Sequence, residues 1–184
     1  MARATAYGRP GRYNAPLGTD TFLFEDDGSI PNSPLPLIVR QGAITPSSGD
    51  PAKAFEQTFA RNGWTNGWRN GIFDYHHYHS TAHEVIGIAA GSATVRFGGE
   101  GGETVGLTAG DVVVIPAGVG HARITQSDDL LVVGAYADGR DWDIVRDTES
   151  AGIAAARKRI AAVPLPAADP VDGESGPLMK LWGP

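Results

Sequence analysis

The sequence predicts an all-β fold, a sandwich or barrel of short strands with minor flanking helices. The 25 glycines and 13 prolines make up about a fifth of the 184 residues, which favours many turns and short strands over a helical bundle. Short apolar segments recur between residues 64 and 136 with turn signals between them, a spacing typical of sandwiches and barrels. The length fits one domain, and 41% hydrophobic residues exclude a wholly disordered chain.

Six segments in this region have the length and apolar character of strands. They span residues 85–88, 94–97, 104–107, 112–115, 122–125 and 130–136. The glycine-rich run at residues 98–102 is expected to be a loop tip between two of them. It is not a phosphate-binding loop, because it lacks the third glycine of G-x-G-x-x-G and no Lys-Ser/Thr follows. The chain has no internal repeat, which excludes a duplicated barrel.

The N-terminal part of the chain is expected to be only partly ordered. Residues 1–20 show no periodicity and predict a disordered tail, so the single domain is expected over residues 21–184. Residues 22–24 form a short apolar run that a turn signal at residues 25–28 ends. Prolines then force an extended path into residues 37–39, which we predict to be an edge strand.

One helix is well marked before the strand-rich region. Asp50 suits the N-cap position, Pro51 the first helical position, and Gly63 the stop. Phe55 and Phe59 lie four residues apart and share one face of this helix. The pattern therefore predicts one helix that begins after Asp50 and ends before Gly63.

The C-terminal part predicts a second helix followed by an extended tail. The helix is expected over residues 149–162 and ends before Pro164. The tail over residues 163–184 is rich in proline and predicts no regular element. The tail is expected to pack onto the barrel through Leu178, Leu181 and Trp182.

Charge and composition exclude several classes of partner. The net charge of −6 leaves no basic face for a phosphate backbone, so we expect no nucleic-acid partner, and the basic cluster at residues 157–159 is expected to be a solvated helix face. The absence of cysteine excludes disulfides, thiolate nucleophiles and sulfur-ligated metal sites. With no apolar leader in residues 1–20 and no long apolar stretch, we expect a soluble cytoplasmic protein that makes no membrane contact.

The five histidines carry the strongest chemical signal. Four of them, His76, His77, His79 and His83, fall within eight residues, and the fifth is His121. On a strand, His77 and His79 point to the same side with Cα atoms about 6.6 Å apart, so that both imidazoles can reach one ion. By the same alternation His76 points away from them, which predicts an outer role rather than metal ligation.

The spacing by itself does not choose between His83 and Glu84. A strand that ran straight on would place His83 on the side of His77 and His79. Residues 80–82 have the character of a break, after which the alternation can restart with Glu84 inside. Both residues therefore remain candidates at this point.

Two motifs resemble those of the cupin family. The first is Gly71-x5-His77-x-His79-x4-Glu84-x6-Gly91, and the second is Gly110-x5-Pro116-x-Gly118-x2-His121, as read directly from the chain. All nine fixed positions are present, at the family's spacings and in its order. Thr125 stands where the family often has Asn, which concerns a turn position and not a ligand.

The resemblance extends to a subgroup, the uncharacterised YjlB-like single-domain cupins. The segments that carry it are FLFEDDGSIPNSPLPLIV, NGWRNGIFDYHHYHSTAHEVIGIAAG, AGDVVVIPAGVGH, VVGAYADGRDWD and VPLPAADPV with GPLMKLW. It implies a double-stranded β-helix, the jelly-roll cupin barrel. It also implies His77, His79, Glu84 and His121 as ligands of one metal ion.

Three imidazoles and one carboxylate form a set that suits Fe, Mn, Ni, Zn or Cu as divalent ions. Burying four such groups on one spot with no metal would cost much free energy, which favours a bound ion over histidines that merely satisfy one another. Four protein ligands leave coordination positions open for water, oxygen or a bidentate substrate. Metal binding without catalysis remains an alternative, because binding and turnover are separate properties.

Other residues are weaker candidates. Arg123, two residues after His121, could face the barrel interior as a catalytic residue that pairs with a substrate anion, or could be a rim arginine paired with a local acid. Tyr75 and Tyr78 could line the pocket, although alternation favours their packing on the outer face. The segment at residues 64–69 is expected to be a loop that covers the barrel mouth. Ser175 belongs to no G-x-S-x-G motif, which argues against a serine hydrolase.

The function that we predict is a metal-dependent enzyme on a small polar metabolite, with a dioxygenase-like oxidoreductase favoured. The alternatives are a metal-dependent sugar isomerase or epimerase, and a non-catalytic module that binds a metal or small ligand. The expected partners are a small-molecule ligand or substrate and, by the cupin resemblance, a second copy of the chain in a homodimer.

Overall fold

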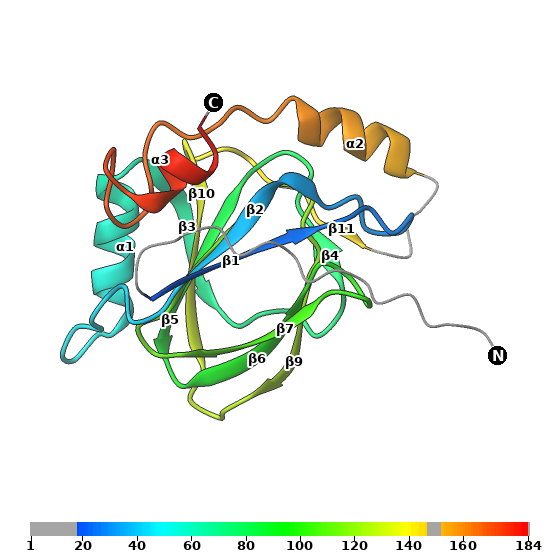
Figure 1. The fold of residues 1–184 in the computed structure, drawn as a ribbon. Coiled ribbons are helices and arrows are strands. Elements are labelled where there is room, and N and C mark those ends of the chain that lie inside the picture. Colours follow the sequence, from blue (N-terminus) through cyan, green and yellow to red (C-terminus); the bar gives the residue numbers. More distant parts are fainter. Residues whose placement is uncertain (1–17, 147–151, 184) are drawn as a thin grey trace.

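The structure is a computed structural model that describes residues 18–146 and 152–183, and two facing antiparallel sheets dominate it (Figure 1). The strands are β1 (Thr19–Phe24), β2 (Ser33–Arg40), β3 (Trp64–Asn70), β4 (His77–Tyr78), β5 (Glu84–Ala90), β6 (Ser92–Phe97), β7 (Glu103–Thr108), β8 (Val112–Ile115), β9 (His121–Gln126), β10 (Leu131–Ala137) and β11 (Val145–Arg146). The helices are α1 (Ala52–Arg61), α2 (Ile153–Ala161) and α3 (Pro177–Leu181). None of these described helices is long and apolar enough to cross a bilayer.

The strand order is that of a jelly roll. One sheet has the order β1-β2-β8-β5-β10-β3 and the other the order β11-β4-β9-β6-β7, and every pairing is antiparallel. Neighbours in each sheet are mostly distant in sequence, so each sheet is completed by segments that return from the other. This arrangement confirms the predicted all-β fold with minor flanking helices.

Alternation along the strands builds two apolar layers. In β8, Val113 and Ile115 point between the sheets, whereas Val112 and Val114 point to the outer face of the six-stranded sheet. That outer face is covered by α1 and by the C-terminal segment, which contributes Leu178. All four β8 residues are buried because this sheet is covered on both faces.

The six predicted central strands are confirmed as β5 to β10, each within two residues of its predicted ends. The loop at residues 98–102 is confirmed as the connection between β6 and β7. The predicted loop at residues 64–69 is wrong, because this segment forms edge strand β3. Its side chains are mostly exposed and show no apolar alternation, and its strand conformation comes from pairing with β10.

The strand at residues 37–39 is not an edge strand, since β2 lies between β1 and β8. Pro31 precedes β2, and Pro34 and Pro36 lie in the half of β2 that does not pair with β8, because that pairing covers only residues 38–40. In that half the strand needs no donors toward β8, so proline is tolerated. Strand β1 begins at Thr19, two residues inside the expected tail, and residues 1–17 lie outside the described residues.

The first helix is confirmed with one difference at its start. Phe55 and Phe59 are buried against the six-stranded sheet, and Gly63 follows the end of α1 with a φ of 80°. No side chain caps the helix. The Asp50 carboxylate instead accepts two hydrogen bonds from Arg69, at 2.9 and 3.0 Å.

The C-terminal part also differs from its prediction in one respect. Helix α2 confirms the second helix from Ile153 onward, whereas residues 147–151 lie outside the described residues. The tail is not without regular structure, because α3 occupies five of its residues. The expected packing of the tail is confirmed, since Leu178 and Trp182 are buried in the outer apolar layer and Leu181 packs against it.

Candidate metal centre

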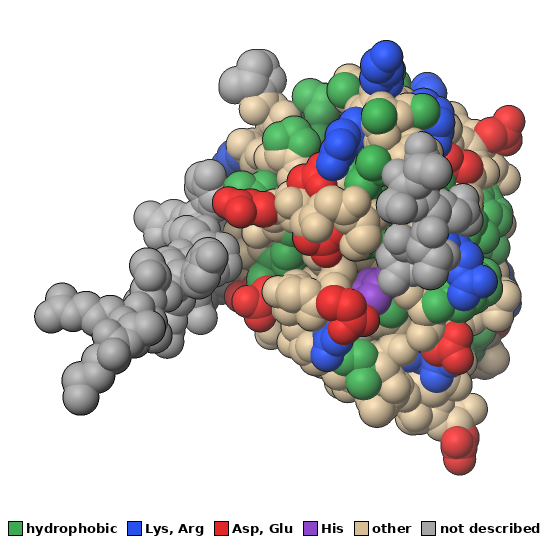
Figure 2. Space-filling model, turned by 90° about the vertical axis from the view of Figure 1, so that its right-hand side faces the viewer, with side chains coloured by type: hydrophobic (Ala, Val, Ile, Leu, Met, Phe, Trp, Pro, Cys, Tyr) green, Lys and Arg blue, Asp and Glu red, His purple; other side chains and the backbone are tan. Residues whose placement is uncertain are grey.

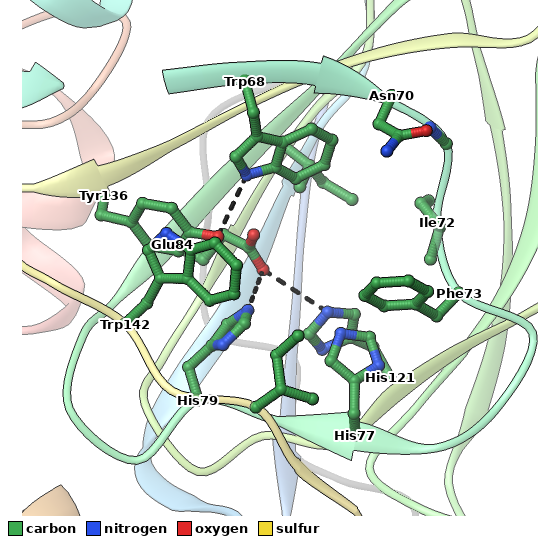
Figure 3. A pocket seen from close by; sticks show the side chains of 13 residues that line it. Trp68, Asn70, Ile72, Phe73, His77, His79, Glu84, His121, Tyr136 and Trp142 are labelled. Carbon is green, nitrogen blue, oxygen red and sulfur yellow. Dashed lines mark hydrogen bonds and ion pairs between the residues drawn. The ribbon is translucent and has the colours of Figure 1, made fainter. Parts of the chain in front are cut away.

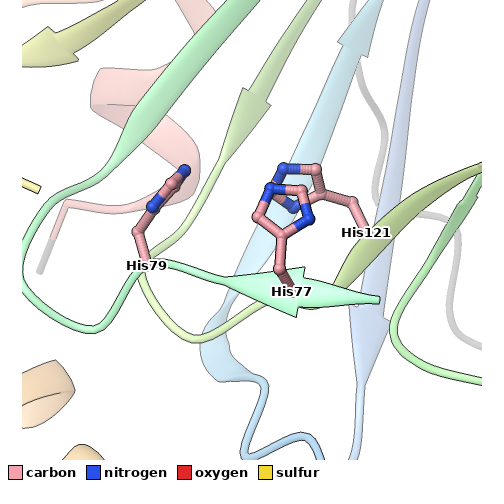
Figure 4. Close-up of side chains that lie close together, drawn as sticks. All are labelled: His77, His79 and His121. Atoms are coloured by element: carbon pink, nitrogen blue, oxygen red, sulfur yellow. The ribbon is translucent and has the colours of Figure 1, made fainter. Parts of the chain in front are cut away.

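Three histidines meet at one end of the space between the sheets (Figure 4). His77 lies on β4, His121 is the first residue of β9, and the two are paired in register. His79 follows directly after β4. One ring nitrogen from each histidine lies within 4.8 Å of the other two, and all three side chains are buried. The H-x-H spacing thus places two imidazoles on one side, as predicted, and the pairing of β4 with β9 brings the third.

The fourth group at this point is Glu84. The chain leaves the strand conformation at residues 80–83, and β5 then begins with Glu84, whose Oε2 lies 3.3 Å from Nε2 of His79 and 3.4 Å from Nε2 of His121. His83 points elsewhere: its Nδ1 accepts a hydrogen bond from the Ala117 amide at 2.9 Å. The break between the strands therefore restarts the alternation, and the geometry favours Glu84 over His83.

Main-chain carbonyls fix the protonation pattern of the three imidazoles. Nδ1 of His77 lies 3.2 Å from the Tyr75 carbonyl, and Nδ1 of His121 lies 3.3 Å from the Val119 carbonyl. Nδ1 of His79 contacts the carbonyl of Asp143. Because a carbonyl can only accept, each Nδ1 must carry the hydrogen, which leaves the Nε2 lone pair free in the neutral ring. These are the tautomers that metal-ligating histidines need.

The electrostatics of the cluster are those of a site built around a positive charge. Burial, with the neighbouring imidazoles of His121 and His79, lowers the pKa of His77 to about 3, so this ring is neutral near pH 7. Burial alone would raise the pKa of Glu84, but the adjacent His79 and His121 outweigh it and lower that pKa. Burial also opposes a charge on His79, yet the Glu84 carboxylate outweighs burial and raises the pKa of His79.

The residues fit a divalent transition metal. Three Nε2 lone pairs and one carboxylate oxygen face a common point, and the negative ends of these acceptors repel one another in a buried place. A proton between His79 and Glu84 relieves part of this repulsion, whereas a cation relieves it for all four groups. Ligand atoms about 2.1 Å from one ion lie about 3 to 4 Å apart, and the 3.3 and 3.4 Å separations from Glu84 fall in this range.

Tyr136 and Trp68 lie beside Glu84 on the side of the six-stranded sheet (Figure 3). Tyr136 is paired with Glu84 across β10 and β5, and its hydroxyl hydrogen-bonds to the carboxylate. The indole Nε1 of Trp68 donates to the same hydroxyl at 3.0 Å. Burial first, and then the Glu84 charge, raises the pKa of Tyr136, so its hydroxyl stays protonated. Sequence reasoning missed Tyr136, because nothing in a strand pattern marks which tyrosine faces a carboxylate.

The cluster opens into a cavity of about 180 Å³. Beyond the four candidate ligands, it is lined by Trp68, Asn70, Gly71, Ile72, Phe73, Ile86, Tyr136, Trp142 and Ile144. The segment at residues 64–69, predicted to cover the mouth, does contribute Trp68, but from strand β3. No sequence pattern marked Trp142 and Ile144, which line the cavity from a loop far along the chain.

Arg123 occupies a different place from that of the histidines. By register it pairs with Val95 on the five-stranded sheet, but it does not line the cavity that holds the three imidazoles. Its Nε donates to the Ile72 carbonyl at 3.0 Å, and it lines a neighbouring cavity with Gln126. Its Nη2 lies 4.0 Å from a carboxylate oxygen of Asp74, the arrangement expected of a rim arginine.

The remaining candidates pack around the site without lining its cavity. Tyr78 is buried beneath α2, which agrees with the expected outer-face packing. Tyr75 lies beside His77, with the Arg146 guanidinium 3.8 Å above its ring. His76 points away from the cluster as expected but is buried, and its Nε2 lies 3.7 Å from a carboxylate oxygen of Glu100.

Acidic and basic side chains are interspersed on the face of the molecule in Figure 2, and no continuous basic surface appears there among the described residues. The expectation that nucleic acid is not a partner stays a prediction from the net charge.

Comparison with known proteins identifies the family. Residues 69–133 match the model of the cupin domain. The uncharacterized protein YjlB of Bacillus subtilis (strain 168) is 41% identical over 165 residues, which cover 89% of this chain and 96% of YjlB. Among solved structures, one match is acireductone dioxygenase from Bacillus anthracis with a cadmium ion in its active centre. It is 20% identical with a TM-score of 0.39, and the match covers 51% of this chain and 63% of the dioxygenase chain. Another is the sugar 3,4-ketoisomerase QdtA from Thermoanaerobacterium thermosaccharolyticum, which is 15% identical with a TM-score of 0.37, and the match covers 52% of this chain and 75% of QdtA. By its domain match and its identity to YjlB over nearly the whole chain, this protein belongs to the cupin family.

Proposed function

We propose that the protein binds one divalent transition metal through His77, His79, Glu84 and His121 and acts as a metal-dependent enzyme on a small molecule. The observation that carries the proposal is the convergence of three imidazole Nε2 lone pairs and one carboxylate on a single buried point. Every imidazole is oriented by a main-chain carbonyl at its Nδ1. Such preorganisation is what metal ligands require.

The protein's own residues have distinct roles in this proposal. The three neutral imidazoles hold the ion, and the Glu84 carboxylate offsets one of its two charges. The Tyr136 hydroxyl, held by Trp68, donates to Glu84 and keeps that carboxylate from turning away from the histidines. A bound ion supplies Lewis-acid activation of a coordinated oxygen atom and, when it is iron, one-electron chemistry with dioxygen.

A dioxygenase-like oxidoreductase is the activity that we favour over a sugar isomerase. An isomerase needs an acid/base side chain that moves a proton on the substrate. Among the described residues that line the cavity, Tyr136 is the only ionisable group besides the four ligands, and its raised pKa makes it a poor base near neutral pH. Redox chemistry at the ion needs no such base, so the lining supports it better.

Elemental analysis of the purified, untagged protein tests the metal site. We expect about one equivalent of transition metal per chain, lost in His79→Ala and in Glu84→Ala while both variants stay folded by circular dichroism. His83→Ala is the matched control, because it removes a buried imidazole from the adjacent position and should retain the metal. Full metal retention in either ligand variant would overturn the assignment of that ligand.

Oxygen consumption and metal preference then separate the functions. Iron in the purified protein with substrate-dependent oxygen uptake supports the oxidoreductase. Turnover with zinc or manganese in anaerobic buffer would point to the isomerase instead. Stabilisation by ligands without turnover under either condition would leave a binding module as the function.

A further inference from the structure

The cavity beside the metal centre is unusual in its lack of charge. Among the described residues that line it, no lysine, arginine or aspartate appears, and the only carboxylate is Glu84. The walls are formed mainly by six large apolar side chains, Trp68, Ile72, Phe73, Ile86, Trp142 and Ile144. Asn70 and the Tyr136 hydroxyl are the polar groups besides the four candidate ligands.

The basic residues nearest in the chain are committed to other partners. Arg123 lines the neighbouring cavity and donates to the Ile72 carbonyl. Arg69 binds Asp50 and Glu56 on the exposed side of β3. Arg140 donates to the Thr81 carbonyl, and the Arg146 guanidinium lies over the ring of Tyr75. A phosphate, or any anion away from the metal, would therefore be desolvated in this cavity without a partner, which is costly.

Exposed apolar side chains concentrate at the cavity mouth. Six large hydrophobic residues are exposed in the described part of the chain, and three of these, Phe73, Trp142 and Ile144, line this cavity. Their exposed fractions are 44%, 41% and 36%. Apolar surface gathered at one concave place is typical of a binding site, because a ligand that covers it removes it from water.

The size and the walls suit a single ring. The volume of about 180 Å³ is close to that of an apolar cavity that holds benzene, about 150 Å³. Tyr136 and Trp142 are stacked with centroids 5.5 Å apart, and Phe73 meets the His77 ring edge-on at 5.1 Å. Flat aromatic walls favour a flat ligand.

We propose that this cavity binds a compact, uncharged molecule with one aromatic or similarly sized apolar ring, whose oxygen-bearing end reaches the histidine cluster. The metal-binding end rests on the proposed function, whereas the recognition of the ring rests on the cavity walls alone. The sequence predicted a small polar metabolite, whereas the cavity walls favour a ligand that is polar only at its metal-binding end. Phosphorylated sugars are therefore excluded as ligands.

Two hydroxamic acids isolate the contribution of the ring. Benzohydroxamic acid and acetohydroxamic acid differ by phenyl against methyl and carry the same chelating group, which is uncharged in the free acid and releases one proton to the buffer when it binds an ion. Calorimetric titration of the zinc-loaded protein, which holds no redox-active ion, should show that the benzo compound binds about tenfold tighter or more, as expected from burying one ring. Equal affinities, or tighter binding of the acetyl compound, would overturn the proposal.

A pair of isoleucines provides the matched variants. Ile144 lines the cavity, whereas Ile124 is similarly exposed, at 46%, and does not line it. Ile144→Asp should reduce benzohydroxamic acid binding about tenfold and Ile124→Asp should leave it unchanged. Both side chains are partly in water, so both variants should fold. The same affinity in both variants would place the ring elsewhere and contradict the proposal.

The metal content of each sample separates a failure of this inference from a failure of the proposed function. If zinc does not bind, the proposed function fails, and the ring is tested on the metal-free protein with benzamide and acetamide, which lack the chelating group. Saturation-transfer NMR should then show contact with benzamide only, lost in Ile144→Asp. Transfer to both amides, or to neither, would overturn the inference.

Discussion

Nδ1 of His79 contacts the main-chain carbonyl of Asp143, a residue 64 positions further along the chain. The Asp143 carboxylate accepts a hydrogen bond from the Ser80 amide at 2.6 Å, and the Ser80 hydroxyl receives another from Nε of Arg159 at 2.6 Å. Nη2 of Arg159 lies 3.7 Å from that carboxylate. Helix α2 therefore holds the loop that orients His79 and carries Trp142 at the cavity mouth.

This relationship predicts that Arg159→Ala weakens metal binding without removing the site. Loss of the guanidinium removes its contacts with Ser80 and Asp143 and leaves only their bond to each other, so that the His79 ring is less firmly oriented. We expect about a tenfold loss of metal affinity, the lower end of the effect of groups that orient ligands. A competition titration of zinc against a chelator measures it. Stoichiometry at saturating zinc should remain one.

Arg157→Ala is the control on the same helix. Its guanidinium lies 2.7 Å from a carboxylate oxygen of Asp26, and Asp26 does not line the cavity. The zinc affinity of this variant should therefore be unchanged. If both variants lost affinity equally, the effect would belong to α2 as a whole and not to the contact with Ser80 and Asp143.

Gly134→Ala should destabilise the protein and disturb the cavity wall. The added Cβ would lie 2.1 Å from Cε2 of Trp68, so the indole would have to move away from the Tyr136 hydroxyl. Overpacking of this kind costs about 1–3 kcal/mol of unfolding free energy. Urea unfolding measures the loss, and near-ultraviolet circular dichroism reports the indole. Gly106→Ala, where a Cβ meets nothing within 4 Å, should be neutral; equal losses in the two variants would contradict the steric argument.

Trp182 should be a main anchor of the C-terminal segment. Its Nε1 donates to the Pro36 carbonyl at 2.8 Å, and its ring lies 4.8 Å from that of His83. Trp182→Ala removes a buried aromatic side chain and should lower the unfolding free energy by about 3–5 kcal/mol. Trp182→Phe should cost less, about 1–3 kcal/mol for the unpaired carbonyl. In the same urea titrations, Leu165→Ala at an exposed position should change stability by less than about 0.5 kcal/mol.

Removal of the metal should lower thermal stability. An ion that binds only the folded chain stabilises it by about 2.7 kcal/mol when its free concentration is one hundred times Kd. Differential scanning calorimetry before and after chelation should show a drop in Tm that added metal reverses. In His77→Ala the drop in Tm on chelation should largely disappear, because this variant lacks one of the proposed ligands. A chelator effect of the same size in that variant would show that the ion binds elsewhere.

Much of the fold followed from local patterns. Strands β5 to β10 were predicted because they are short apolar segments with turn signals between them, and α1 because Phe55 and Phe59 mark one face. Strand β3 was not predicted, since its residues show no alternation and β10 alone draws it into the sheet. The position of β2 inside its sheet likewise depended on β1, which pairs along its other side.

The sequence by itself determined the chemistry of the centre. The H-x-H spacing sets two imidazoles on one side of a strand, and the resemblance to the cupin motifs implied Glu84 and His121 as the other two ligands. Only the tertiary structure decided which groups surround that centre. Tyr136, Trp142, Asp143 and Arg159 come from segments far apart in the chain, and they gather around the histidines, directly or through one another, only because two sheets and a helix pack there. Spacing along a strand is fixed by backbone geometry, but contacts between distant segments depend on how the whole chain packs, and no local pattern records them.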